Sequence, residues 1–139
     1  MSSLGALVET IKVYKEMNVT DHIWDMGRTL VKGINNIAKE YDLQDYLYLQ
    51  GAECSPNLVV CDKEKRSSFE YRTVFLQEMM KSGILMPYIA IAYEHTENEI
   101  NQTLEAARKA MKRYCDALNR DVKQFIEGNI IKSVFRKYN

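Results

Sequence analysis

The chain has 139 residues, 46% of them hydrophobic, and its 19 basic residues balance 19 acidic ones. A chain of this length can bury one hydrophobic core without disulfides or structural metal ions. Because the charges cancel and are interspersed, long-range attraction to nucleic acid or to an anionic membrane surface is not expected.

The three cysteines, Cys54, Cys61 and Cys115, are an odd number and have no spacing typical of a zinc site. The first residues lack the basic and apolar regions of a secretory signal. The apolar runs are too short to span a bilayer. These features predict a cytoplasmic protein with reduced thiols and no metal site.

Two helices are predicted in the first 41 residues. Residues 4–17 place apolar side chains at helical spacing but have no convincing start signal. Thr20 or Asp21 can cap a second helix. Its apolar stripe advances in steps of four and three residues and comprises Ile23, Gly27, Leu30, Ile34, Ile37 and Tyr41. We interpret Gly27 on this stripe as a point of close packing rather than a ligand contact.

A β-hairpin is predicted next. In residues 45–50 (DYLYLQ), Leu47 and Leu49 face one way and the two tyrosines face the other. Residues 58–62 (LVVCD) form a second strand after a break rich in turn-forming residues.

A helix follows the hairpin. Residues 67–70 (SSFE) have the spacing of a capping box, with a hydroxyl at the N-cap and a carboxylate three residues later. The helix should end near Ser82, with Gly83 in the left-handed conformation common after helices.

The next segment contains the candidate base His95. Residues 84–86 and 89–93 are predicted as two short strands. Residues 96–99 (TENE) are a second capping box, ahead of a long amphipathic helix. His95 therefore lies just before an N-cap, and we interpret it as a structural joint rather than a catalytic base.

A last helix is predicted for residues 120–128, followed by the apolar and basic tail NIIKSVFRKYN. The tail is either a partner-binding arm or a segment packed on its own protein. The order of elements predicts one α+β domain over residues 1–139, a small, mainly antiparallel sheet covered by helices on one face.

No self-contained active site is predicted. The glycines are scattered and form no phosphate-binding loop, and no nucleophile turn or clustered metal ligands are found. The basic and aromatic tail is too short to indicate nucleic-acid binding. We therefore expect this chain to contain no catalytic, cofactor-binding or metal-binding residue.

Several segments, taken in order, resemble the C-terminal small domain of class III pyridoxal-phosphate aminotransferases. The most similar branch contains glutamate-1-semialdehyde 2,1-aminomutase. The resembling segments are LVETIKVYKEMNVTDHIWDMGRTLVKGINNIAKEY, FLQEMMKSGILMP, HTENEINQTLEAARKAM and VFRKYN. The block HTENEINQTLEAA is the most specific, and the resemblance extends from about Leu4 to Asn139.

The resemblance implies the C-terminal domain of the fold type I transferases, excised from a larger enzyme at an introduced Met1. The parent enzyme would use pyridoxal phosphate on a lysine outside this chain, so the chain alone would be inert and hold no cofactor. Its partners would be the upstream large domain and, in the parent, a second subunit of a homodimer. The domain would cover the substrate cleft and exclude water.

The chain departs from the aminomutases in one loop. Only residues 88–94 separate Pro87 from His95, and no residue matches a loop glutamate that approaches the substrate in those enzymes. The parent could therefore be an aminomutase or a transaminase of another aldehyde or ketone. Pro87, Tyr88 and Ile89 are predicted to face the substrate. A free-standing α+β ligand-binding or regulatory module remains the alternative.

Overall fold

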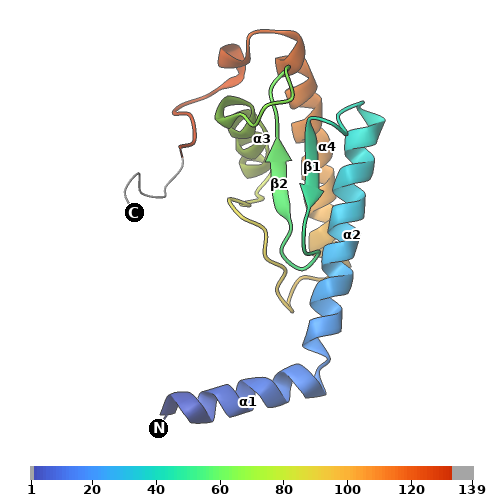
Figure 1. Cartoon of the computed structure of the whole chain (residues 1–139), viewed down its shortest axis with the longest axis vertical. Helices are drawn as coiled ribbons and strands as arrows, with labels where there is room; N and C mark the ends of the chain where they lie inside the picture. The colour runs from blue at the N-terminus through green and yellow to red at the C-terminus, as the bar shows by residue number, and fades with distance from the viewer. Residues whose placement is uncertain (1, 133–139) are drawn as a thin grey trace.

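The computed structural model describes residues 2–132 and has the predicted α+β architecture. Figure 1 shows a two-stranded hairpin with α3 and α4 behind it and α2 alongside. In chain order the elements are α1 (Ser2–Glu16), α2 (Val19–Glu40), β1 (Leu47–Gln50), β2 (Asn57–Val60), α3 (Phe69–Lys81), α4 (Glu97–Asn119) and the 3-10 turn η1 (Val122–Phe125).

The hairpin buries one face against the helices. β1 and β2 are antiparallel, with Leu47 opposite Val60 and Leu49 opposite Leu58. These four side chains are all buried, whereas Tyr48 on the other face is only half-buried. The alternation predicted for residues 45–50 is confirmed, because successive strand residues point to opposite faces.

Asn35 joins α2 to β1. Its side-chain amide donates to the carbonyl oxygen of Leu49 (3.0 Å), and its Oδ1 accepts the amide N–H of the same residue (2.8 Å). These are the two backbone groups that a further strand would otherwise pair with. Asn35 thus closes the outer edge of β1, where an open edge would invite pairing with another chain.

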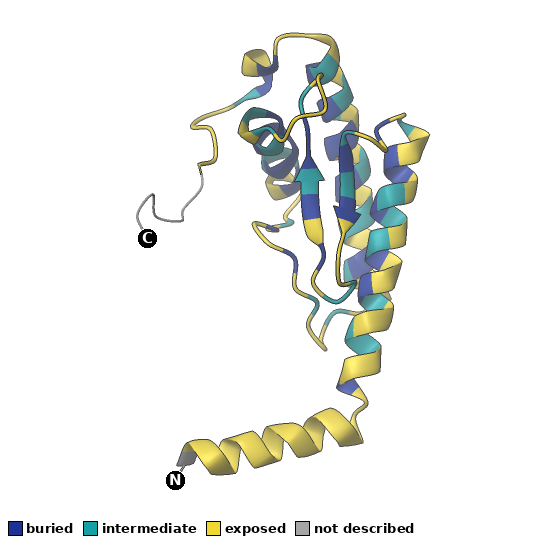
Figure 2. Cartoon of the chain, viewed as in Figure 1, coloured by how far each residue is buried: buried dark blue, intermediate teal, exposed yellow. Residues whose placement is uncertain are grey.

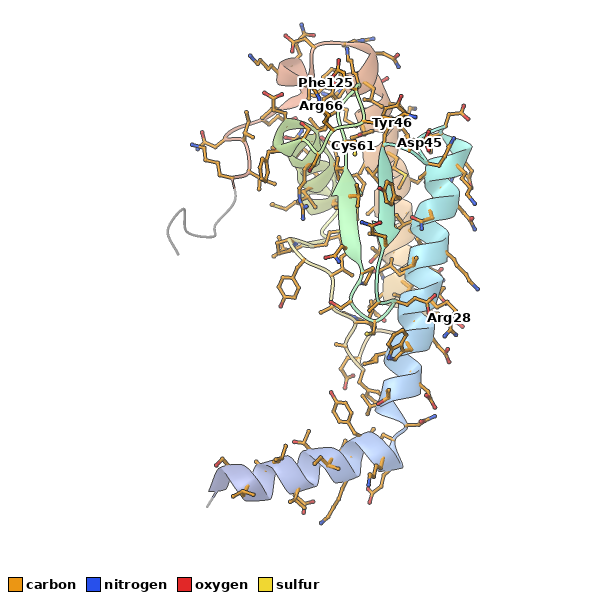
Figure 3. The ribbon with its side chains drawn as sticks, in the orientation of Figure 1. Arg28, Asp45, Tyr46, Cys61, Arg66 and Phe125 are labelled. Carbon is orange, nitrogen blue, oxygen red and sulfur yellow. The ribbon has the colours of Figure 1, made fainter. Side chains whose placement is uncertain are left out.

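The centre of the core lies between α2, α3 and α4. Ile34, Phe75, Met111 and Tyr114 are fully buried there. The Tyr114 hydroxyl donates to the carbonyl oxygen of Cys61, just after β2. Figure 3 shows Cys61 at the same end of the hairpin as Phe125. Burial raises the pKa of both the Tyr114 hydroxyl and the Cys61 thiol, because an ion at either position would lose its hydration.

Helix α1 projects away from this core. Figure 2 shows residues 3–16 exposed, and the large apolar side chains of α1 range from 45% (Val13) to 69% (Leu4) exposed. The link to α2 is Asn18, in the left-handed conformation at φ 50°, with no side-chain cap. The capping role predicted for Thr20 or Asp21 is wrong, because α2 already starts at Val19.

The ends of α3 and α4 follow their local sequence. Gly83 has the predicted left-handed conformation at φ 81°, and Thr96 with Glu99 forms the predicted capping box. At α3 the N-cap is Ser68, whose hydroxyl accepts the Tyr71 N–H. The box predicted to start at Ser67 is therefore wrong by one residue.

The strands predicted at residues 84–86 and 89–93 are absent from the structure. Both segments are irregular, and the sheet of the described residues has two strands. The apolar side chains that suggested strands do bury, since Met86 and Ile89 are each 7% exposed. Isolated contacts replace a ladder of backbone hydrogen bonds, and burial alone does not make a strand.

The helix predicted for residues 120–128 is reduced to the single turn η1. The chain then runs along α3, where the Gln77 side chain donates to the carbonyl oxygen of Phe125 and accepts the Glu127 N–H. The Ile131 N–H donates to the Thr73 hydroxyl (3.0 Å). Residues 127–132 are nevertheless all exposed, so the described part of the tail contacts α3 without being buried on it; residues 133–139 lie outside the described part.

Candidate functional site

The candidate site is the segment of residues 84–95 between α3 and α4. It contains Pro87, Tyr88 and Ile89, the residues predicted to face a substrate. Pro87 is exposed and the Tyr88 side chain is 77% exposed, but the Ile89 side chain is only 7% exposed. Pro87 and Tyr88 can therefore present side chains to a ligand, whereas Ile89 contributes its backbone and anchors the segment in the core.

The backbone of this segment is held at three alternate residues. The Arg72 guanidinium donates to the carbonyl oxygen of Pro87 (3.3 Å), and the Ser55 hydroxyl donates to that of Ile89 (2.8 Å). The Ile91 N–H donates to the carbonyl oxygen of Cys54 (3.0 Å). Neither Arg72 nor Ser55 was singled out from the sequence, because their partners are backbone atoms, which no sequence pattern reports.

The hairpin turn that carries Cys54 and Ser55 is itself fixed on α2. A Cβ on Gly27 would lie 2.1 Å from the carbonyl oxygen of Glu53, so only glycine allows this approach. The Glu53 carboxylate also pairs with Arg28 on α2 at 3.1 Å. Figure 3 places Arg28 on the part of α2 beside this turn. The close packing predicted at Gly27 is confirmed.

Two cavities flank the segment. One of about 250 Å³ lies between it and the helices α2 and α4, and its polar lining includes His95, Glu99 and Thr103. The other, of about 110 Å³, lies between the segment, the hairpin turn and α3, where Arg72 lines it. Tyr88 lines both cavities. Concave sites with a few convergent polar groups are the usual places for small-molecule binding.

His95 lies at the joint before α4. Its Nδ1 accepts the Ala92 N–H at 3.0 Å. The carbonyl oxygen of His95 is 2.9 Å from Nε2 of His22 on α2, and the His22 ring lies 5.0 Å from the ring of Tyr93. The imidazole of His95 thus closes a turn of its own backbone, which agrees with its interpretation as a structural joint.

The carboxylate at this joint belongs to the helix cap. Glu99 accepts the backbone N–H and the hydroxyl of Thr96. Hydrogen bonds from the Thr96 hydroxyl and backbone lower the pKa of Glu99 to about 2. Glu99 is therefore an anion that stabilises the helix start, not a proton donor at neutral pH.

Other reactive groups do not gather here. Within residues 2–132 no three histidine, cysteine or acidic side chains lie close enough to hold a metal ion. Cys54, Cys61 and Cys115 are all free thiols.

Within residues 2–132, no helix is both long and apolar enough to cross a membrane.

No family model matches. Three glutamate-1-semialdehyde 2,1-aminomutases do match, from Halalkalibacterium halodurans (28% identical over 80% of this chain), Clostridium tetani (33% over 70%) and Natronomonas pharaonis (25% over 78%). The chain is similar to part of each of these aminomutases. The resemblance seen in the sequence is thereby confirmed.

The chain spans only part of the aminomutases. It covers 28%, 26% and 32% of the three relatives' own lengths. The alignment with the Natronomonas aminomutase runs over 145 positions, more than the 139 residues of this chain. That relative therefore carries residues with no counterpart here, even inside the shared region.

One solved structure has a similar fold. It is the FumI protein of Sphingopyxis sp. MTA144 in its pyridoxal phosphate (PLP) internal aldimine form, with a TM-score of 0.66 and 18% identity. The match covers 81% of this chain and 26% of the FumI chain. The predicted α+β fold class is confirmed: this chain has the fold of part of the FumI chain.

The cavities do not fit pyridoxal phosphate by themselves. No lysine or arginine is among the described residues that line the larger cavity, so it offers neither an amine for an imine bond nor a cation for the phosphate. The smaller cavity has one arginine, Arg72, but no lysine. A cofactor bound near segment 84–95 would need its covalent and phosphate partners from elsewhere.

Proposed function

We propose that this chain is one domain of a larger class III pyridoxal-phosphate enzyme, an aminomutase or aminotransferase, and that segment 84–95 covers its substrate cleft. The proposal rests on one observation: the chain matches only part of the aminomutases and only part of FumI. Most of this chain matches both the aminomutases and FumI, yet it spans about a quarter to a third of each. A C-terminal origin within the parent enzyme is part of the proposal.

In such an enzyme the bound cofactor would stabilise negative charge on the substrate carbon as an electron sink. The present chain would contribute part of the wall of the substrate cleft. Pro87 and Tyr88 stand exposed on a backbone that is held from behind, so they can close over a substrate and exclude water. The chain alone would be inert.

The exposed apolar surface supports a large-domain partner. Helix α1 leaves an apolar stripe in solvent, and on segment 84–95 Leu85 is 74% exposed. An exposed apolar stripe such as the one on α1 marks an interaction site in folded proteins. We propose that α1 packs against the large domain and the second subunit of a homodimer. Free thiols at all three cysteines suit a cytoplasmic enzyme.

The reaction type stays open between 2,1-aminomutation and transamination. In the short connection from Pro87 to His95, no residue is matched to the loop glutamate of the aminomutases. Transamination of a different aldehyde or ketone needs no such residue. The substrate would then be selected by the surface around Tyr88.

Absorbance of bound pyridoxal phosphate tests the proposal. The isolated chain, mixed with the cofactor and an amino donor, should bind no cofactor and show no turnover. The complete enzyme that contains this domain should bind one cofactor per subunit on a lysine outside residues 1–139. Stoichiometric cofactor on a lysine of this chain would contradict the proposal. Tight binding of another small molecule by the isolated chain would favour the regulatory module.

A further inference from the structure

The three contacts on segment 84–95 form a regular set. They fall on residues 87, 89 and 91, and each joins the segment to a different atom of the hairpin turn or of α3. The backbone groups of Pro87, Ile89 and Ile91 are thus each held by the hairpin turn or by α3, and Tyr88, between the first two, is left exposed.

Arg72 is placed to hold two structures at once. Its Nη2 donates to the carbonyl oxygen of Pro87 (3.3 Å) and its Nη1 to that of Leu58 in β2 (3.4 Å). The guanidinium is a rigid planar fork, so its two contacts fix the distance between the strand and the segment. A lysine could donate to one of these carbonyls but could not span both with fixed geometry.

Ser55 holds the same segment, and it lies on a hairpin turn that is itself fixed on α2. Its hydroxyl donates to the carbonyl oxygen of Ile89, and its turn is fixed on α2 by the close approach at Gly27 and the Arg28–Glu53 ion pair. The segment is therefore ordered before any ligand arrives. Ordering a loop on binding costs affinity, and a loop ordered beforehand avoids that cost.

We propose that Arg72 and Ser55 are positioning residues that fix the backbone of residues 87–91 and so hold Tyr88 as a ridge between the two cavities. Their effect on a substrate rests on the proposed function, in which Tyr88 faces the cleft. Their effect on the segment itself does not, and it is measurable in this chain alone.

The first measurement is hydrogen exchange of the Ile91 amide, which donates to Cys54. Removing one hydrogen bond that holds a segment weakens it by about 1 kcal/mol, which corresponds to about fivefold faster exchange. R72A and S55A should each show this acceleration, with R72K between R72A and the wild type. Exchange of the Met111 amide in α4 should stay at its wild-type rate.

Arg66 provides the matched control. It is an exposed arginine in the link between β2 and α3, and its partners are Asp62 and Glu64 rather than segment 84–95. R66A should leave Ile91 exchange unchanged. Equal Ile91 exchange in R72A, S55A and wild type would overturn the proposal.

The second measurement uses the complete enzyme. A mobile Tyr88 ridge must be ordered during binding, so R72A should raise KM several-fold with kcat changed less, and R66A should change neither. Faster Ile91 exchange with unchanged KM would overturn the role toward substrate. A wild-type enzyme that binds no pyridoxal phosphate would instead overturn the proposed function and leave the exchange result standing.

Discussion

At the scale of single residues, side chains that bond to backbone atoms shape this molecule. Asn35 satisfies both backbone groups of Leu49, and Ser55 satisfies a carbonyl of the candidate segment. Asn35 replaces the contacts that a neighbouring strand would otherwise make with β1. Their loss leaves buried or half-buried polar groups unpaired, which costs more than the net value of one hydrogen bond.

Replacing Asn35 by alanine should therefore lower the free energy of unfolding by about 1–3 kcal/mol, the usual cost of leaving a buried polar group unsatisfied. Urea denaturation measures this. The control is N36A, because Asn36 is the next residue of α2 and is exposed. Equal unfolding free energies for N35A and N36A would contradict the prediction.

Gly27 provides a second test at this scale. Alanine normally stabilises a helix relative to glycine by about 1 kcal/mol. At Gly27 the new Cβ would lie 2.1 Å from the Glu53 carbonyl oxygen, so G27A should instead destabilise by about 1–3 kcal/mol, as overpacking does. G5A is the control, since nothing lies within 4 Å of its Cβ. A stabilising G27A would show that the turn can move away.

At the scale of elements, caps and hydrogen-bond partners decide where helices begin and whether a segment becomes a strand. Thr96 and Glu99 start α4 through reciprocal bonds. Residues 84–95 precede that cap, and they have enough apolar side chains for a strand. No strand edge is available to them, because α2 occupies the β1 side through Asn35 and α3 contributes Arg72 on the other.

The capping box makes stability depend on pH. Glu99 has a lowered pKa of about 2 in the folded protein against an ordinary 4.5, so its contribution is present above pH 4.5 and is lost as the pH falls toward 2. At pH 7, E99Q should unfold at lower urea than wild type. This difference should shrink between pH 4.5 and pH 2 and then vanish. A difference that is constant over this range would exclude a role for the charge.

At the scale of the whole molecule, the chain consists of a packed unit and a helix outside it. The core joins α2, α3, α4 and the hairpin, whereas α1 is exposed on all sides (Figure 2). An isolated helix of this length is marginally stable in water. Its apolar stripe is the feature of this fold that most clearly requires a partner.

Deleting residues 1–16 should therefore leave the free energy of unfolding of the remaining chain within about 0.5 kcal/mol of its original value, as for changes outside the core. Urea denaturation followed at Trp24 fluorescence measures this. Removing η1 and the tail after it should be destabilising by comparison, because Val122 and Phe125 are buried. A large loss on deleting α1 would mean that α1 folds back onto the core.

The sequence by itself determined the features that depend on neighbours along the chain. The helical stripes, the hairpin, the Gly83 helix end and the Thr96 cap all follow from local spacing and backbone preference. The resemblance to the aminomutases also predicts residues 87–89 as substrate-facing, and this stays a prediction. His95 before the cap needed no tertiary knowledge to be interpreted as a joint.

Only the tertiary structure decided the features that depend on contacts between distant residues. Apolar residues at 84–93 could have joined a sheet, but the partners present are Arg72, Ser55 and the Cys54 carbonyl, which hold single atoms rather than pair as a strand. These contacts also determine that the Ile89 side chain lies in the core and the Tyr88 side chain in solvent. Side-chain bonds to backbone atoms leave no periodic trace in a sequence, because any residue supplies the same carbonyl.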